Sequence, residues 1–212
     1  MKRYCTLFLS LLYLLSSCSN REFHTQEGDL LFQVSEATPM SAAIAEATAQ
    51  HDSIKYDHVA LLAIEKGRPY VLEASSKHGV SRTTWADFVA SSNLIDGKPG
   101  IVVMRLKDKT VSIPQAILRA KSHLGEAYDW SYLPDNGKMY CSELIYDTFL
   151  DKKDTPIFTA KPMNFRNAKG EMPAFWTNLF QKLGEPIPEG VLGTNPNDMA
   201  KEAMLMEVFR YF

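Results

Sequence analysis

The segment YDHVALLAIEKGRPYVLEAS, residues 56–75, has the pattern of a β-hairpin. Two runs rich in β-forming residues flank the segment EKGR, where Gly67 favours a tight turn. If Lys66 and Gly67 form a two-residue loop, residue 65 pairs with residue 68, and Glu73 then lies on the same face as His58, one diagonal step away. A three-residue loop would shift the register by one and put Glu73 on the opposite face.

The rest of the chain alternates strand and helix patterns around this hairpin. Apolar runs predict strands at 29–34 and 100–107, and apolar periodicity predicts helices at 40–50, 83–91, 112–125, 141–149 and 174–184. Thr83 or Thr84 can cap the second of these helices, Ser112 can cap the third, and Gly125 can end it. The C-terminal part, residues 151–212, is rich in Pro and Gly and is expected to wrap the surface of the same domain.

The composition is that of an ordinary globular protein. The chain has 212 residues, of which 45% are hydrophobic and 23% are charged, and this length is enough for one compact domain with a core. The formal net charge is −2, which gives no reason to expect a nucleic acid partner. The sequence contains no phosphate-binding glycine loop and no GxSxG motif that would support a serine nucleophile.

The N-terminus has the pattern of a bacterial lipoprotein signal. A short basic segment, MKRY, precedes the apolar run CTLFLSLLYLL, which is too short to span a membrane comfortably, and LSSC follows at residues 15–18. LSSC resembles the lipobox, in which a small residue precedes a cysteine that is acylated and becomes the first residue. An ordinary secretory signal with an incidental cysteine and a single-pass anchor are the alternatives.

The lipobox divides the chain into a signal peptide at 1–17, a polar tether at 18–27 and a domain at 28–212. Cys18 would then carry lipid, and we expect a membrane-anchored lipoprotein of the bacterial cell envelope, on the periplasmic or the surface side. The remaining cysteine of the mature chain, Cys141, has no intramolecular partner. An unpaired cysteine outside the cytoplasm is either buried and inert or retained for its chemistry.

Cys141 begins the apolar face of the helix predicted in KMYCSELIYDTF, residues 138–149. Unpaired N–H groups and the helix dipole favour a thiolate at that position and can stabilise an oxyanion. A nucleophilic cysteine needs a base, and among the five histidines only His58 interrupts an apolar strand and has a carboxylate, Glu73, on its predicted face. Alternatively, His58 and Glu73 are structural, or all three residues bind zinc, although no ligand pair such as CxxC or HExxH occurs.

Three segments resemble the hallmark segments of the NlpC/P60 papain-like cysteine peptidases: GDLLFQ at 28–33, DHVALL at 57–62 and YCSELIYDTF at 140–149. In those enzymes a tyrosine loop and the cysteine helix precede the two strands, whereas here the two strands come first. This order resembles that of the circularly permuted papain-like amidases of the YiiX type, with the lecithin retinol acyltransferase-like proteins as more distant relatives. The resemblance implies an α+β papain-like fold, with an antiparallel sheet packed against helices.

The resemblance also implies roles for individual residues. Cys141 matches the nucleophile, His58 the base and Glu73 the polar residue that orients the imidazole. Tyr128 matches a loop tyrosine that lines the substrate cleft beside the nucleophile, and Ser142 matches a position in the cleft wall.

Two residues depart from the unpermuted family. Tyr140 and Glu143 replace the aspartate and the glycine that flank Cys-Ser there. Peptidoglycan specificity is therefore not carried over, and Tyr140 either lines the cleft or packs beside it.

Together these features predict a monomeric thiol hydrolase that cleaves amide bonds through an acyl-enzyme, without a cofactor or a metal ion. The expected substrate is a peptide, an N-acyl amino acid or a cell-wall fragment. Two alternatives remain open. One is a non-catalytic envelope binding module with a blocked cleft, and the other is a lipid acyltransferase or esterase with an open apolar groove.

Overall fold

The computed structural model describes residues 24–49, 51–107 and 109–212. The predicted signal peptide and Cys18, with most of the predicted tether, lie outside these residues. In the described part of the chain, no helix combines the length and the apolar character that crossing a membrane requires.

The structure is an α+β arrangement of one six-stranded antiparallel sheet, two small two-stranded sheets and six helices within the described residues. The strands are β1 (Leu30–Gln33), β2 (His58–Glu65), β3 (Arg68–Ser75), β4 (Gly79–Thr84), β5 (Leu94–Ile95), β6 (Lys98–Pro99), β7 (Ile101–Leu106), β8 (Lys161–Pro162), β9 (Leu192–Gly193) and β10 (Leu205–Arg210). The helices are α1 (Pro39–Thr48), α2 (Trp85–Ala90), α3 (Ile113–Ser122), α4 (Cys141–Thr148), α5 (Ala174–Leu183) and α6 (Pro196–Ala200).

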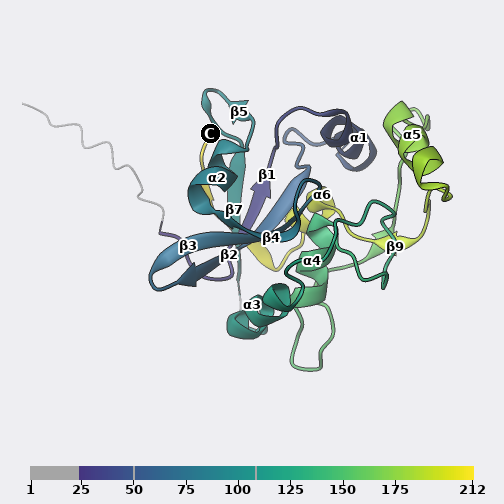
Figure 1. Ribbon diagram of the computed structural model, residues 1–212. Coiled ribbons are helices and arrows are strands. Elements are labelled where there is room, and N and C mark those ends of the chain that lie inside the picture. Colours follow the sequence, from purple (N-terminus) through teal and green to yellow (C-terminus); the bar gives the residue numbers. More distant parts are fainter. Residues whose placement is uncertain (1–23, 50, 108) are drawn as a thin grey trace, which may run out of the picture.

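The strands of the main sheet lie in the order β10-β7-β1-β2-β3-β4. Helix α4 packs on β2 and β3, α3 packs on α4, and α2 packs on β3 and β4 (Figure 1). Alternate residues of the strands lie on opposite faces of the sheet. Val59 and Leu61 pack in the core under α3 and α4, whereas Ala60 and Leu62 pack in the core that contains Phe88 of α2. The sheet is therefore covered on both faces, which explains why its central strands are apolar on both sides.

The β2–β3 hairpin has the predicted register. Lys66 and Gly67 form the loop with positive φ angles of 51° and 76°, and Glu65 pairs with Arg68. Positive φ at both loop residues is the geometry that a two-residue hairpin loop requires, and glycine adopts it without steric cost. The pairing continues to Leu61 with Leu72, so Glu73 follows on the face that the two-residue loop predicts.

The structure corrects several predicted bounds. Residues 79–84, partly assigned to a helix above, form β4, and the helix α2 starts only at Trp85, with Thr84 accepting from the backbone N–H of Asp87. Ser112 stands at the N-cap of α3 but makes no capping hydrogen bond, and α3 ends at Ser122 rather than at Gly125. The tail 204–212 provides an edge strand of the sheet, β10, which pairs with β7.

Candidate active site

Cys141 lies at the first position of α4, where Tyr140 is the N-cap residue. Its residue surface is 5% exposed, and its side chain belongs to the core cluster that also contains Val59, Leu61 and Ile145. It is a free thiol and also lines a cavity of about 360 Å³. The thiol is thus held by packing on one side and borders a cavity on the other.

His58 and Glu73 form a short, buried pair. His58 Nε2 lies 2.6 Å from Glu73 Oε2, and the two side chains are only 12% and 10% exposed. Thr83 of β4 donates a hydrogen bond from its hydroxyl to the other oxygen of Glu73, Oε1. Both carboxylate oxygens are therefore bound, which fixes the carboxylate and, through Nε2, the orientation of the imidazole.

The pKa of His58 is raised well above its ordinary value, although burial alone would lower it. The hydrogen bond to Glu73 and the interaction with Cys141, together with the charges of both groups, favour the imidazolium and outweigh the desolvation. Because Nε2 is engaged by Glu73, Nδ1 is the ring nitrogen left for Cys141. The three side chains thus follow one another in the order thiol, imidazole, carboxylate.

The pKa of Glu73 is shifted in the opposite direction. Burial would raise it, but the hydrogen bond and the charge of His58, with the hydroxyl of Thr83, lower the pKa of Glu73 below its ordinary value. The stabilisation from ionised Glu73 is therefore present above its unfolded-state pKa and is lost as the pH falls through its folded-state pKa. The stabilisation from protonated His58 has the opposite sign: it is present below the unfolded-state pKa and is lost as the pH rises through the raised one.

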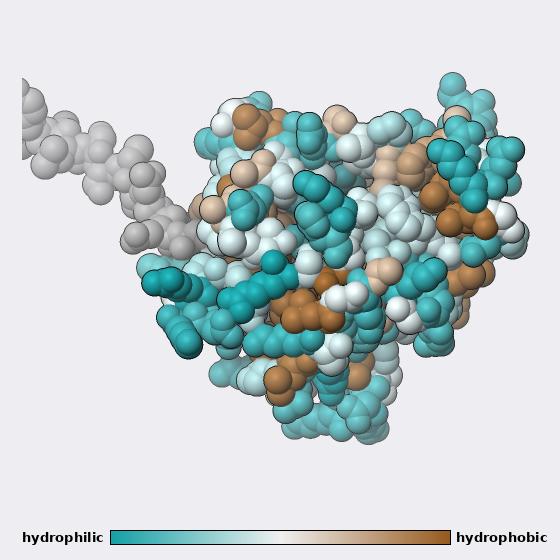
Figure 2. Space-filling view, in the orientation of Figure 1, coloured by the Kyte–Doolittle hydropathy of each residue, from teal (hydrophilic) through white to brown (hydrophobic). Residues whose placement is uncertain are grey.

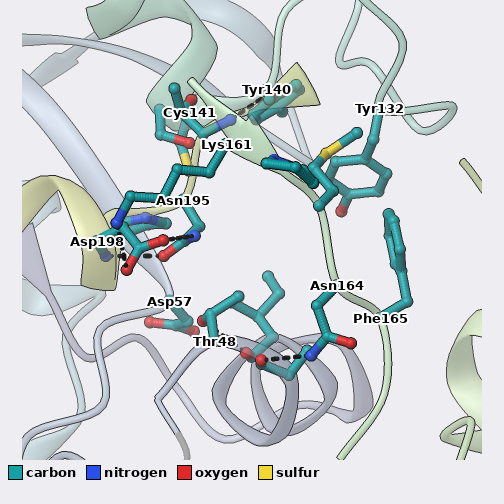
Figure 3. Close-up of a pocket in the computed structure, with 18 of the residues that line it drawn as sticks. Thr48, Asp57, Tyr132, Tyr140, Cys141, Lys161, Asn164, Phe165, Asn195 and Asp198 are labelled. Atoms are coloured by element: carbon teal, nitrogen blue, oxygen red, sulfur yellow. Dashed lines mark hydrogen bonds and ion pairs between the residues drawn. The ribbon is translucent and has the colours of Figure 1, made fainter. Parts of the chain in front are cut away.

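The cavity beside Cys141 has a polar side and an aromatic side (Figure 3). Figure 3 shows Lys161, Asn195, Asp198 and Asp57 toward one side of the cavity and Tyr132 and Phe165 toward the other. The aromatic side continues into a cluster of rings in edge-to-face contact, made by Tyr132, Phe165 and Trp176. The cavity can accommodate a group with one apolar part and one polar or charged part.

The loop before α4 positions Tyr128 in this cavity. Backbone hydrogen bonds join Asp129 N–H to Met139 C=O and Met139 N–H to Ala127 C=O, so the loop folds back against the residues that precede Cys141. The buried Asp129 carboxylate holds the loop, because it accepts from the backbone N–H groups of Ser131 and Leu133. Burial raises the pKa of Tyr128 well above its ordinary value, so its phenol stays protonated and can donate a hydrogen bond.

Ser142 and Tyr140 also line the cavity, on either side of the thiol in sequence. The hydroxyl of Ser142 is buried and has no hydrogen-bond partner among the described residues. Tyr140 is 5% exposed, and its hydroxyl accepts from the backbone N–H of Thr194 at 3.1 Å. Tyr140 therefore both lines the cavity and packs, and it ties the C-terminal segment to the helix that carries Cys141.

The C-terminal part provides much of the cavity wall, and the sequence did not identify these residues. Lys161, Phe165, Trp176 and Asn195 lie between 20 and 54 positions after Cys141 and come from loops and short elements. The aromatic helix at 174–184 was predicted, but nothing in its sequence placed it against this cavity. Figure 2 shows a largely hydrophilic face, with small apolar patches that include one beside α5.

Glu143 is a buried acid in the first turn of α4, and its carboxylate accepts from the Tyr140 N–H. Burial raises its pKa to about 8, opposed by that hydrogen bond and assisted by the nearby carboxylates of Asp129, Asp147 and Asp135. Between its unfolded-state pKa and pH 8, the folded chain binds a proton that the unfolded chain does not, so stability falls as the pH rises across this range.

The variant Glu143→Gln keeps an acceptor for the Tyr140 N–H and removes the charge. We expect it to be more stable than the parent chain at pH 8, by on the order of 4 kcal/mol, and to converge with it near pH 4.5. Chemical denaturation at both pH values measures this difference, with Glu46→Gln, an exposed glutamate of α1, as the control. An equal change in stability at both pH values would contradict the assignment of the effect to the charge of Glu143.

These features define a papain-like α+β protein: an antiparallel sheet, a helix that begins with a cysteine, and a histidine on the neighbouring strand. In this chain the strand with the histidine precedes the helix with the cysteine. The family model described as "Permuted papain-like amidase enzyme, YaeF/YiiX, C92 family" matches residues 24–209. The chain therefore belongs to this family, and the resemblance stated from the sequence is confirmed.

Two relatives agree with this assignment. The chain is 31% identical over 183 residues to the uncharacterized protein YiiX of Escherichia coli strain K12, covering 85% of this chain and 84% of that protein. The crystal structure of the metalloprotein YiiX from Escherichia coli O157:H7 superposes with a TM-score of 0.70 at 26% identity and covers 89% of this chain and 98% of that one. The permuted papain-like fold predicted from motif order is thus confirmed by sequence and by structure.

Proposed function

We propose that this protein is a thiol hydrolase that cleaves amide bonds, with Cys141 as the nucleophile, His58 as the acid and base and Glu73 as the residue that orients His58. The observation that carries the proposal is the order thiol, imidazole, carboxylate at the edge of a cavity. Membership of an amidase family supports the type of bond. Such an order activates cysteine nucleophiles in general, because the imidazolium stabilises the thiolate and the carboxylate holds the ring.

The reaction follows from the positions of these groups. The thiolate of Cys141 attacks the amide carbonyl, and backbone N–H groups at the start of α4 stabilise the resulting oxyanion. The imidazolium of His58 gives its proton to the leaving amine, the C–N bond breaks, and an acyl-thioester remains on Cys141. Neutral His58 then takes a proton from water, the hydroxide adds to the thioester, and the carboxylic acid leaves with restoration of the thiolate–imidazolium pair.

Tyr128 and Ser142 are proposed to bind the substrate beside the nucleophile. Both line the cavity with Cys141. The phenol of Tyr128 stays protonated, so it can donate to a carbonyl oxygen. The hydroxyl of Ser142 is buried without a partner among the described residues, so the proposed part of Ser142 is to form the wall of the cavity.

No step of this reaction uses a metal ion. YiiX from Escherichia coli O157:H7 is described as a metalloprotein, which raises the question whether the residues of this chain fit a metal site. In the described residues, no group of three or more His, Cys, Asp and Glu side chains could hold an ion. Glu73 meets His58 at Nε2, the ring nitrogen opposite the one left for Cys141, and so these three donors do not converge on one point.

The cavity favours a hydrolase over the two alternatives. A binding module with a degenerate cleft is expected to be blocked at Cys141, whereas Cys141 borders a cavity of about 360 Å³. A lipid acyltransferase or esterase is expected to have a groove that is apolar throughout, whereas only one side of this cavity is aromatic and the other carries charged residues such as Lys161, Lys201 and Asp57. The proposed substrates are a peptide, an N-acyl amino acid or a cell-wall fragment, and the proposed location is the cell envelope, through lipid on Cys18.

Alkylation of Cys141 by iodoacetamide tests the thiolate–imidazolium pair. We expect the rate of alkylation below pH 7 to fall at least about tenfold in His58→Ala, because the thiolate is the reactive form and the positive charge of a neighbouring imidazolium favours it. His24→Ala, which changes an exposed histidine far from Cys141 in sequence, is the control and should leave the rate unchanged. The same pH dependence in the parent chain and in His58→Ala would refute the pair.

A further inference from the structure

Asp57 precedes the proposed base and is held rigidly at the start of β2. Its backbone N–H donates to Gln33 C=O at 3.2 Å, and its Oδ1 accepts from the backbone N–H of Ser35 at 2.7 Å. The residue is 7% exposed and lines the cavity that contains Cys141. Figure 3 shows its carboxylate on the polar side of this cavity, apart from Tyr132 and Phe165.

The other charged carboxylates and amines of the cavity lining form ion pairs with each other. Lys161 Nζ lies 3.4 Å from Asp198 Oδ1, and Lys201 Nζ lies 2.6 Å from Asp52 Oδ2. Asp57 makes no ion pair with a lysine or arginine in residues 24–49, 51–107 and 109–212, and its carboxylate is held only by neutral donors, chiefly the backbone N–H and the side chain of Ser35. One buried carboxylate of the cavity is therefore left without a lysine or arginine partner.

A buried carboxylate without a cation is costly, and a cationic group bound beside it removes this cost. Burial raises the pKa of Asp57, while the Ser35 N–H and the charge of His58 lower it. A bound ammonium group would supply both a charged donor and the compensating charge. The aromatic side of the cavity would take the apolar part of the same molecule.

We propose that Asp57 is a specificity-determining residue whose carboxylate binds a primary ammonium group of the substrate. The site then selects amides that carry a free amino group over amides in which that group is acylated. This inference deepens the proposed function and rests on it for the reaction. This ammonium group is either the α-amino group of an N-terminal residue or the amino group of a side chain, and Asp57 would bind both in the same way.

Three fluorogenic amides test the inference on the full-length protein: leucyl, N-acetyl-leucyl and N-acetyl-lysyl aminomethylcoumarin. We expect kcat/KM for one ammonium-bearing amide to exceed that for N-acetyl-leucyl by roughly 10- to 100-fold, the range of one charge-assisted hydrogen bond. Preference for the leucyl amide identifies an α-amino group, and preference for the N-acetyl-lysyl amide identifies a side-chain amine. In Asp57→Asn, which keeps an acceptor for Ser35 N–H, this preference should fall at least about tenfold.

The ratio of the substrates separates specificity from other effects of the substitution. A change that acts through the neighbouring His58, or through folding, lowers hydrolysis of all three amides and leaves their ratio intact, and this result would overturn the inference. Asp96→Asn is the matched control, because Asp96 is exposed in the β5–β6 turn with a φ of 51°, a conformation that asparagine also adopts. The control should keep the full preference.

A binding measurement separates this inference from the proposed function. Calorimetry with Cys141→Ala compares leucinamide, N-acetyl-leucinamide and N-acetyl-lysinamide, with Asp57 intact and in the double variant Cys141→Ala/Asp57→Asn. Binding that prefers an ammonium ligand and depends on Asp57, without hydrolysis by the parent chain, would support the inference and refute the proposed hydrolase. Hydrolysis with no preference for any ammonium substrate would refute the inference and leave the hydrolase standing.

Discussion

Replacement of Cys141 by alanine is expected to abolish amide hydrolysis, with a loss of kcat/KM on the order of 10⁴-fold or more, the scale on which removal of a nucleophile acts in other hydrolases. The reason is that no other described side chain replaces the sulfur at the start of α4, and the serine next to it has a hydroxyl that is buried without a partner. The measurement is steady-state hydrolysis of the coumarin amide that the parent chain cleaves fastest.

The fold should survive this substitution. The exchange removes one sulfur atom from a residue that is 5% exposed, so we expect a loss of stability of about 1 kcal/mol and an unchanged circular dichroism spectrum. Ser76→Ala, which changes an exposed residue in the β3–β4 turn, is the control for hydrolysis. Residual activity of Cys141→Ala above one hundredth of the parent value would show that another group is the nucleophile.

Replacement of Glu73 by glutamine is expected to lower kcat by roughly 10²- to 10⁴-fold, the range over which an orienting carboxylate acts in a catalytic triad. The pH profile should also change. Protonated His58 is required for the pair with Cys141, so activity falls as the pH rises through the pKa of His58, which Glu73 helps to raise. Without the negative charge of Glu73, this pKa decreases and the alkaline limb of the profile moves to lower pH.

A second glutamate of the same hairpin supplies the matched control. Glu65 lies at the other end of β2, is exposed, and forms an ion pair with Arg82 at 2.8 Å. Glu65→Gln should keep both kcat and the position of the alkaline limb. If Glu73→Gln lowers kcat without moving that limb, Glu73 supports the site only as a packing residue and not through the charge on the imidazole.

The sequence predicted the parts of the site that local rules determine. The register of β2 and β3 depends on the Lys66-Gly67 loop, and a two-residue loop leaves one possible face for Glu73. The helix from Cys141 depends on its apolar spacing, which the buried side chains of Leu144 and Ile145 match. Local geometry and motif order were therefore enough to identify Cys141, His58 and Glu73 as candidate catalytic residues.

The remaining parts depend on contacts between distant segments. Thr83, which binds Glu73, lies in a strand that the sequence pattern assigned to a helix, because its Thr-rich segment also fits a helix cap. Asp57 became a candidate only when the structure placed it beside the cavity. The cavity wall at Lys161 and Asn195 comes from short elements without periodicity, and such elements carry no signal for where they pack.

The pairing of β10 with β7 has a consequence for the order in which the protein folds. Leu205 pairs with Leu106, and β1 pairs with β7 across about 70 residues, so much of the sheet forms between segments that are synthesised far apart in time. Sheets built from such distant pairings fold slowly, because loop closure must precede the stabilising contacts. The hairpin with His58 and Glu73 closes over a two-residue loop and can form early, whereas α4 must join it from a distant segment of the chain. During refolding, we therefore expect the backbone amides of the β2–β3 hairpin to become protected from hydrogen exchange before Cys141 packs beside His58.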